Sequence, residues 1–253
     1  MSGHSKWAGI KHKKALIDAK RGRVFTKFIR EIMMAAKLGG NDVENNPRLR
    51  LAIERAKSFN MPSENIKRAI AKGTGGDAAV LEQVMYEGYG PAGVAIMVEA
   101  LTDNRQRTSS EIKHIFSKYN GNLGQTGCVG WLFVRKGIIK IEKEKIDEES
   151  LFSLILEVGA EDLKTEENEY EVITKPQDLE RIKKVLEEKG INISETSLAM
   201  VPKSTIKLEG KDAENLLKLM DGLEGDDDVQ NVYSNFDIAD EVIEAIIGSN
   251  LDI

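Results

Sequence analysis

The stretch that decides the fold class is VMYEGYGPAGVAIMV, which occupies residues 84–98. Val94, Ile96 and Val98 recur at every second position after its centre, Gly88 to Pro91, and the extended-type residues Val84 to Glu87 precede that centre. A period of two is typical of β-strands, and glycine and proline favour the turn that joins two of them. The stretch therefore predicts a pair of adjacent strands, and the chain around it must supply the rest of a sheet.

The chain downstream of this pair alternates helical and extended patterns. Residues 104–119 predict a helix with Ile112, Ile115 and Phe116 facing inward, and 129–134 predict a strand. A second set of elements follows within residues 137–200 and includes a helix from 148 to 158. The closing elements are a strand at 203–208, a helix from 212 to 220 and a strand at 229–236. Alternation of this kind is typical of small split-βαβ units.

The segment upstream has the helical period instead. Apolar residues recur every three or four positions from Val24 to Ala36, and Gly39 and Gly40 follow as a helix stop. Asn46 and Pro47 predict the start of a second helix, and Pro62 with Ser63 that of a third, which ends at Gly73. The second helix is expected to carry Arg48, Arg50, Arg55 and Lys57 mostly outward. Residues 1 to about 22 lack a sustained apolar period and are interpreted as a basic arm.

We therefore expect an α+β protein with an N-terminal three-helix domain followed by two small ferredoxin-like domains, one inserted in the other. The expected division is 1–76 for arm and bundle, 77–136 with 203–238 for a discontinuous domain, 137–202 for the inserted domain, and 239–253 for a C-terminal tail.

Charge is distributed very unevenly along the 253 residues. Residues 1–40 hold ten Lys or Arg against two acids, a net charge of +8, although the whole chain is at −6. Residues 1–75 are at +11, which leaves −17 for the remainder. A cationic end attracts phosphates and releases their counterions, whereas an acidic body repels them. The pattern predicts a nucleic-acid partner for the arm and protein partners for the acidic domains.

Residue types argue against an enzyme. Three histidines (His4, His12, His114) and a single cysteine, Cys128, lack the spacing of a catalytic zinc site. The glycine-rich residues 121–127 run from a helix to a strand, the reverse of a phosphate-binding loop. Residues 226–228, three aspartates, are interpreted as a solvated turn rather than a cation site. We expect no enzymatic activity, no metal and no cofactor.

A basic arm with one aromatic residue favours nucleic-acid binding, because Trp7 offers a flat face between the cations Lys6 and Lys11. The alternative is a solvated basic tail. The basic and polar loop at Asn104 and Arg105 is a second candidate contact for nucleic acid. Alternatively, Asn104 or Asp103 could simply cap the following helix. The candidate nucleic-acid-binding residues are Lys6, Trp7, Lys11, His12, Lys13, Lys14, Lys20, Arg21, Arg23, Lys27, Arg30, Asn104 and Arg105.

Several spaced motifs resemble one known family. They are MSGHSKW (1–7), IKHKK (10–14), DAKRG (18–22), NMP (60–62), YEGYGP (86–91), TDNR (102–105) and GNLG (121–124). Together they resemble the YebC/PmpR family over essentially the whole chain. The resemblance implies a three-domain cytoplasmic protein that binds DNA as a transcriptional regulator. It also implies an alternative, because a related mitochondrial protein activates translation and other bacterial members are linked to stalled ribosomes.

Two further hypotheses remain open at this stage. A translation factor that binds ribosomal or transfer RNA would use the same basic residues. A small-molecule sensor or enzyme would use a cleft near Asn104, Arg105 and Gly124. No apolar run approaches the roughly 20 residues of a membrane span, and a lone cysteine fits a reducing compartment, so we expect a cytoplasmic location without a membrane partner.

Overall fold

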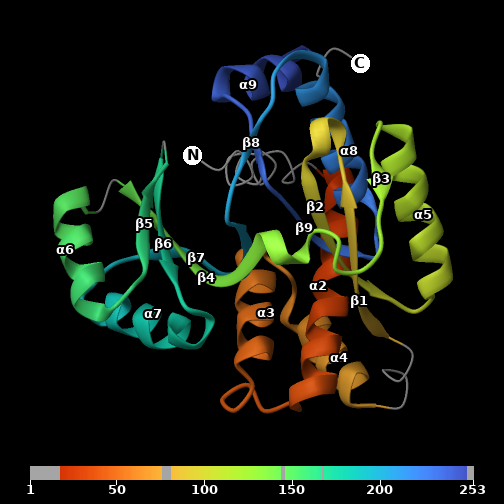
Figure 1. The fold of residues 1–253 in the computed structure, drawn as a ribbon. Coiled ribbons are helices and arrows are strands. Elements are labelled where there is room, and N and C mark those ends of the chain that lie inside the picture. The colour runs from red at the N-terminus through yellow and green to blue at the C-terminus, as the bar shows by residue number, and fades with distance from the viewer. Residues whose placement is uncertain (1–17, 76–80, 144–145, 167, 250–253) are drawn as a thin grey trace. The chain divides into compact units, whose positions relative to one another are not determined.

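The computed structural model describes residues 18–75, 81–143, 146–166 and 168–249, with the side chains of 18–21, 240, 244 and 247–249 outside the description. The chain divides into two compact units (Figure 1). One unit is Phe133–Lys203, and the other joins the described parts of Ser2–Leu132 and Ser204–Ile253. Helices come first and antiparallel sheets with helices follow, which confirms the α+β fold class.

The described residues of the larger unit begin with three helices: α2 (Asp18–Gly39), α3 (Pro47–Ser58) and α4 (Ser63–Thr74). Asn46 joins the first two, because its amide donates to the carbonyls of Ala35 and Gly40 and its carbonyl oxygen caps α3 at the Leu49 N–H, 3.1 Å away. Helices α2 and α4 pack closely at Gly73, where a Cβ would lie 2.5 Å from the Met33 carbonyl oxygen. The predicted starts of α3 and α4 are confirmed.

The predicted end of the arm at about residue 22 is wrong, because α2 already begins at Asp18 and passes through Gly22. A glycine inside a helix costs about 1 kcal/mol relative to alanine. Its neighbours are good helix formers, and the apolar stripe that begins at Val24 carries the helix onward. A single glycine is therefore a weak stop signal here.

The first sheet has the strand order β3-β1-β2-β9. Strands β1 (Glu82–Tyr89) and β2 (Ala95–Thr102) are antiparallel and form the predicted pair, with the short helix η2 (Pro91–Gly93) between them. Helix α5 (Arg105–Lys118) leads from β2 to β3 (Asn122–Leu123), and β1 lies between these two parallel strands. This arrangement is the split-βαβ unit that the sequence predicts.

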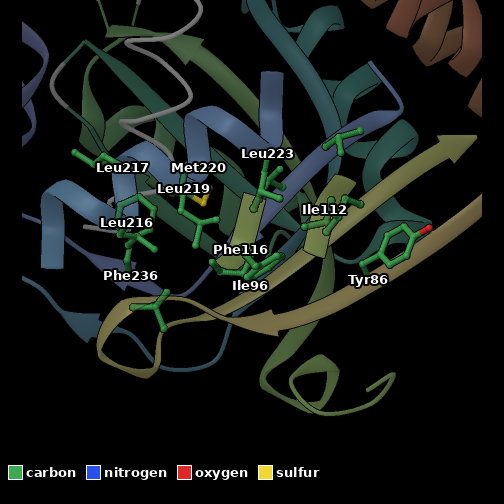
Figure 2. Close-up of a cluster of buried hydrophobic side chains, with 14 of the residues drawn as sticks. Tyr86, Ile96, Ile112, Phe116, Leu216, Leu217, Leu219, Met220, Leu223 and Phe236 are labelled. Carbon is green, nitrogen blue, oxygen red and sulfur yellow. The ribbon is translucent and has the colours of Figure 1, made fainter. Parts of the chain in front are cut away.

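Helix α8 (Gly210–Gly225) and strand β9 (Val229–Ser234) return from the far end of the chain to complete this domain. Leucines of α8, such as Leu216 and Leu219, pack with Phe116 and Ile112 of α5 and with Ile96 of β2 (Figure 2). Each fully buried side chain of this kind contributes about 1.5–3 kcal/mol. This shared core makes residues more than 100 positions apart in the sequence one domain.

Three closing elements extend the larger unit. Strands β8 (Ile206–Lys207) and β10 (Phe236–Asp237) form a two-stranded parallel sheet. Helix α9 (Asp240–Ser249) follows, and its Ile243 is fully buried in the core cluster. This helix is not predicted from the sequence, and the predicted helix at 212–220 is too short at both ends, because α8 begins at Gly210 and ends at Gly225.

The smaller unit has the strand order β5-β6-β4-β7, with all neighbours antiparallel. Its elements in chain order are β4 (Phe133–Glu142), α6 (Glu148–Val158), β5 (Asp162–Thr165), β6 (Glu169–Thr174), η5 (Pro176–Asp178), α7 (Leu179–Glu188) and β7 (Ile193–Pro202). Order and directions are those of a ferredoxin-like fold. Helix α6 has the bounds that the sequence predicts, whereas β5 is not predicted.

The predicted strand at 129–134 is wrong. Residues 130–132 form the short helix η3 (Gly130–Leu132), and β4 begins only at Phe133. The backbone N–H groups of Val129 and Gly130 donate to the Glu87 carboxylate and so cannot join a sheet. Within the described residues, no helix has the length and apolar character needed to cross a membrane.

Candidate nucleic-acid interface

The predicted binding residues divide by what the structure describes. Lys6, Trp7, Lys11, His12, Lys13 and Lys14 lie outside the described residues, as do the side chains of Lys20 and Arg21. Arg23 is exposed on the first part of α2 and makes no hydrogen bond or ion pair to any described residue. Arg23 is therefore the described cation nearest to the arm, and its charge faces solvent.

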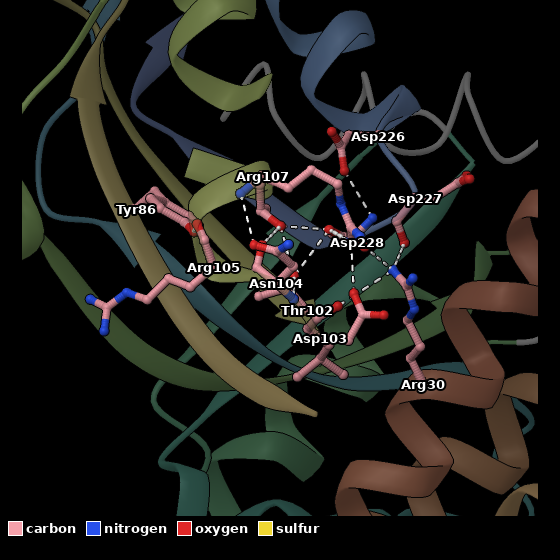
Figure 3. Close-up of polar contacts among 12 residues, drawn as sticks. Arg30, Tyr86, Thr102, Asp103, Asn104, Arg105, Arg107, Asp226, Asp227 and Asp228 are labelled. Carbon is pink, nitrogen blue, oxygen red and sulfur yellow. Dashed lines mark hydrogen bonds and ion pairs between the residues drawn. The ribbon is translucent and has the colours of Figure 1, made fainter. Parts of the chain in front are cut away.

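Lys27 and Arg30, one and two turns further along α2, make intramolecular contacts, and Figure 3 shows those of Arg30. The Lys27 ammonium donates to the Glu224 carbonyl oxygen at 2.7 Å. The Arg30 guanidinium donates to the carbonyl oxygens of Asp227 at 2.6 Å and Leu101 at 3.4 Å, and it pairs with the Asp228 carboxylate. Lys27 thus fastens α2 to the last turn of α8, and Arg30 fastens it to the end of β2 and to the loop between α8 and β9.

Asp228 is the centre of this contact, with a side chain only 4% exposed. Its carboxylate accepts hydrogen bonds from the hydroxyls of Thr102 (3.1 Å) and Thr108 (2.5 Å), and from Arg107 at 2.7 Å, in addition to Arg30. The prediction of a solvated turn at 226–228 is therefore wrong for Asp228. Burial alone would raise the pKa of this carboxyl, but Thr108, Arg107 and Arg30 outweigh burial and lower it.

The second predicted nucleic-acid contact consists of Asn104 and Arg105, and these two residues have different roles in the structure. The Asn104 side chain accepts from the Arg107 backbone N–H at 3.1 Å, so it caps α5. The Arg105 side chain is exposed and points away from the Asp228 cluster (Figure 3). Arg107 is occupied by Asp103 and Asp228, which raise the pKa of its guanidinium. Arg105 is thus the cation of this loop that is open to a ligand.

Further exposed cations lie on the bundle. Lys67, Arg68 and Lys72 are exposed along α4, on the side opposite its buried Ile66 and Ala69. Arg68 lies 3.4 Å from Glu64, an exposed pair of the kind that contributes little. Lys57 of α3 is exposed as well. The expectation that Arg48 and Arg50 also lie mostly outward is wrong.

Arg48 and Arg50 are half-buried and act within the fold. The Arg48 guanidinium binds both carboxylate oxygens of Glu31, at 2.8 and 3.2 Å, which joins α3 to α2. Arg50 donates to the carbonyl oxygens of Val43 and Glu44, each at 3.2 Å, and so holds the loop before α3. The bundle therefore uses part of its positive charge internally and exposes the rest.

The glycine-rich loop after α5 is built around a carboxylate. Glu87 is 5% exposed and accepts the N–H groups of Gly127, Val129 and Gly130 at 2.7–2.8 Å. Burial tends to raise the pKa of Glu87, but these three hydrogen bonds prevail and lower it. Because a negative side chain already takes the N–H groups that a phosphate would need, the loop is unsuited to cradling a phosphate.

Cys128 lies in the same loop and is half-buried. Burial, followed by the nearby charge of Glu87, raises the pKa of its thiol, the reverse of what activates a nucleophile. A cavity of about 610 Å³ lies beside α6, lined among others by Asp147, Ser150 and Lys189. Neither Asn104 nor Gly124 is among its lining residues.

One group of carboxylates has the spacing of a cation site. Ligand atoms of Glu111, Asp226 and Asp228 lie within 4.8 Å of one another. Burial and the charges of both aspartates raise the pKa of Glu111. Arg30 and Arg107 already neutralise Asp228, so little net negative charge remains to attract a divalent cation.

Comparisons with known proteins extend over both units. The family model described as "TACO1/YebC protein N-terminal domain" matches residues 5–76, and that described as "TACO1/YebC second and third domain" matches residues 81–236. The chain belongs to the TACO1/YebC family. This membership confirms the family resemblance that the sequence motifs indicate.

Individual members of the TACO1/YebC family match over nearly their full length. A relative from Syntrophus aciditrophicus is 55% identical over 97% of this chain and 99% of its own, and one from Natranaerobius thermophilus is 54% identical over 96% and 99%. Both are named "probable transcriptional regulatory protein". The crystal structure of a conserved hypothetical protein from Aquifex aeolicus has a TM-score of 0.83 at 47% identity, covering 89% of this chain and 94% of that one.

Two buried carboxylates of this TACO1/YebC chain that organise the fold near the candidate residues, Asp228 and Glu87, are not predicted from the sequence. Each is an acid next to apolar strand residues, Val229 and Tyr86 respectively. A charge beside a buried strand position is a signal that the side chain has found partners. That signal indicates a buried acid without naming its partners, which come from distant parts of the chain.

Proposed function

We propose that this protein is a non-enzymatic regulator that binds nucleic acid, and that its nucleic acid is DNA. The observation that carries the proposal is the net charge of +8 within residues 1–40 of a chain that is at −6 overall. Such a segment is attracted to a polyanion, and the acidic remainder orients the encounter. The relatives' name, "probable transcriptional regulatory protein", supports DNA as the target.

The contacts of the described Lys and Arg side chains indicate which of these cations would bind phosphates. Lys27 and Arg30 already bind within the fold, so we assign them the supporting role of fixing α2. The side chains of Arg23, Lys57, Lys67 and Lys72 are exposed and make no hydrogen bond or ion pair to a described residue. We propose that these cations, together with Arg105 and the Lys and Arg residues of the arm, form the phosphate-binding surface.

The acidic part of the chain has a separate role in this proposal. The residues after 75 carry a net charge of −17 and would be repelled by a phosphate backbone. Apart from the exposed Arg105, we assign them to contacts with protein partners. A regulator with this division holds nucleic acid through its N-terminal segment and presents its sheet domains to other proteins.

Binding of the full-length protein to a labelled DNA duplex tests the proposal. Substituting Lys11, Lys13 and Lys14 together by Glu should abolish most of the affinity. A matched control replaces three exposed lysines elsewhere, Lys175, Lys184 and Lys207, by Glu and should retain binding within a few-fold, although the net charge changes equally. Equal affinity of the arm variant and the wild type would overturn the proposal.

A competition experiment separates DNA from RNA as the target. Unlabelled duplex DNA should displace the labelled duplex at lower concentration than a structured RNA of the same length. In cells, crosslinking followed by sequencing of bound DNA and bound RNA should recover DNA sites. Recovery of ribosomal or transfer RNA alone would replace DNA binding by the translational alternative.

A further inference from the structure

Helix α6 of the smaller unit exposes two large apolar side chains on one side (Figure 1 labels the helix). Phe152 is 49% exposed and Leu156 is 62% exposed, and because four positions separate them they are neighbours on the helix surface. The core side of the same helix consists of Leu151 and Ile155, which are 0% and 2% exposed. Phe152 and Leu156 are therefore not core residues, and the packing of the smaller unit does not explain them.

Helix α7 of the same unit has the pattern expected of a surface helix. Its buried residues are Leu179, Ile182 and Leu186. Its exposed residues are all charged: Arg181, Lys184, Glu187 and Glu188. Single exposed apolar residues are common on protein surfaces, but two on adjacent turns form a continuous apolar patch. The difference between the helices indicates that the outer face of α6, which consists of Phe152, Leu156 and the exposed residues beside them, serves for binding.

An open depression lies beside the two apolar side chains. It is the cavity of about 610 Å³ described above, and the half-buried Ile146, Leu154 and Ile191 give it apolar walls. Glu149 and Ser153 also line it, and they precede Phe152 and Leu156 by three positions, which places them one turn away on the same side of α6. Apolar side chains beside a depression suit a helix that lays its own apolar stripe against them.

The charge of α6 is entirely negative. Residues 147–158 contain four acids against no Lys or Arg, a net charge of −4, and the four are Asp147, Glu148, Glu149 and Glu157. All four side chains are exposed. Lys189, which also lines the depression, lies 3.7 Å from Glu157, and an exposed pair of this kind contributes little. A partner that covers Phe152 and Leu156 must therefore bring positive charge together with apolar side chains.

We propose that the outer face of α6 binds a basic amphipathic helix of a protein partner. Apolar residues of that helix pack against Phe152 and Leu156, and its Lys or Arg residues lie opposite the four acids. The inference rests on the proposed function, in which the acidic domains contact proteins, and it adds where one such contact lies and what chemistry the partner has.

The same charge disfavours other occupants of this face. A second copy that used the face in a symmetric dimer would bring two sets of acids together, and like charges across an interface oppose association. A phosphate backbone and an anionic lipid surface would be repelled for the same reason. A basic protein segment is the occupant whose charge complements α6.

Binding of a designed peptide to the full-length protein tests the proposal. The probe is a labelled helical peptide with Leu at every third or fourth position and Lys at the others. The control peptide has the same composition in a scrambled order, so that its leucines do not share one face. Fluorescence anisotropy should show saturable binding of the patterned peptide and at least about tenfold weaker binding of the scrambled one.

Substitutions on α6 locate the binding site. Phe152→Ala together with Leu156→Ala should weaken binding of the patterned peptide about tenfold, because both apolar anchors are lost. Glu148→Gln with Glu149→Gln should weaken it several-fold, whereas Glu187→Gln with Glu188→Gln, a matched exposed pair on α7, should leave it unchanged. All of these side chains are exposed, so each variant should keep the circular dichroism spectrum of the wild type and its affinity for the DNA duplex.

Two results with the peptides would overturn the proposal: equal affinity of the wild type and the double alanine variant for the patterned peptide, or equal affinity of the wild type for both peptides. A dimer that sedimentation detects in the wild type but not in the double alanine variant would also overturn it and assign the face to a second copy. In each case, retained binding of the DNA duplex would leave the proposed nucleic-acid function intact. Absence of DNA binding by the wild type would instead remove that function and leave the peptide result unchanged.

Discussion

At the scale of single residues, the fold of the larger unit depends on the charge of Asp228. A carboxylate 4% exposed is stable there because two guanidinium groups and two hydroxyls surround it. Removing one member of a buried charged pair costs more than the pair contributes, since the remaining charge stays buried without compensation. Asp228 therefore links α2, α5 and the start of β9.

Asp228→Asn should lower the free energy of unfolding by about 3–5 kcal/mol, because Arg30 and Arg107 lose their shared counter-charge. Urea denaturation followed by circular dichroism measures the change. Asp227→Asn is the matched control: its side chain is exposed, and the change should stay within about 0.5 kcal/mol. Equal changes in the free energy of unfolding for both substitutions would show that the contacts of Asp228 stabilise the fold no more than an exposed aspartate does.

The lowered pKa of Asp228 also predicts a pH dependence. A carboxyl with a lower pKa in the folded than in the unfolded chain stabilises the fold above its ordinary value, here 3.8, and this contribution is lost as pH falls through the folded-state pKa. The difference in unfolding free energy between wild type and Asp228→Asn should therefore be greatest near neutral pH and shrink below pH about 4. A difference that is constant between pH 7 and pH 3 would contradict this assignment.

The partners of Asp228 explain why a sequence analysis overlooks it. Three consecutive aspartates are typical of a solvated turn. The charged partners of the buried Asp228 carboxylate are Arg30, 198 positions away, and Arg107, 121 positions away. Local composition cannot report contacts of this range, so this residue is understood only in the folded chain.

At the scale of elements, the loop between β3 and η3 takes its shape from Glu87 rather than from regular structure. Glu87→Gln replaces one acceptor oxygen by an amide donor, so the three N–H groups cannot all remain bound. We expect a loss of about 1–3 kcal/mol and faster amide hydrogen exchange at Gly127, Val129 and Gly130. Glu82→Gln, exposed at the start of the same strand, should change neither quantity.

Alanine substitutions at two glycines of the helical bundle should change its stability in opposite directions. Gly73→Ala should destabilise the bundle by about 1–3 kcal/mol, because the new Cβ would lie 2.5 Å from the Met33 carbonyl oxygen. Gly22→Ala should stabilise it by about 0.5–1 kcal/mol, since nothing lies within 4 Å and alanine favours a helix. Thermal denaturation of both variants measures the pair. Shifts of the same sign would contradict the packing of α2 against α4.

Elements with local signals are the ones that the sequence predicts well. Helix α6 is predicted with its observed bounds because Asp147 caps its start through the Ser150 N–H and Gly159, at φ 80°, ends it. The strand expected at 129–134 fails because its N–H groups have a remote partner in Glu87. Success and failure thus follow the range of the interactions that define each element.

At the scale of the whole molecule, the period of the apolar residues is enough to predict an α+β fold with split-βαβ units. The candidate interface is less predictable. Charge alone marks Lys27, Arg30 and Arg23 equally, yet only Arg23 is exposed without a partner among the described residues. Which cations remain open to a ligand depends on carboxylates and carbonyls that the fold brings beside them.

The measurement that tests the central claim most directly is the salt dependence of DNA binding. If about six phosphates are neutralised, the logarithm of the binding constant should fall with the logarithm of salt concentration at a slope of about −5. Replacing Lys11, Lys13 and Lys14 together by Glu should make this slope shallower by about 3, whereas the control at Lys175, Lys184 and Lys207 should keep it. Binding that is insensitive to salt, or an unchanged slope in the arm variant, would contradict the account.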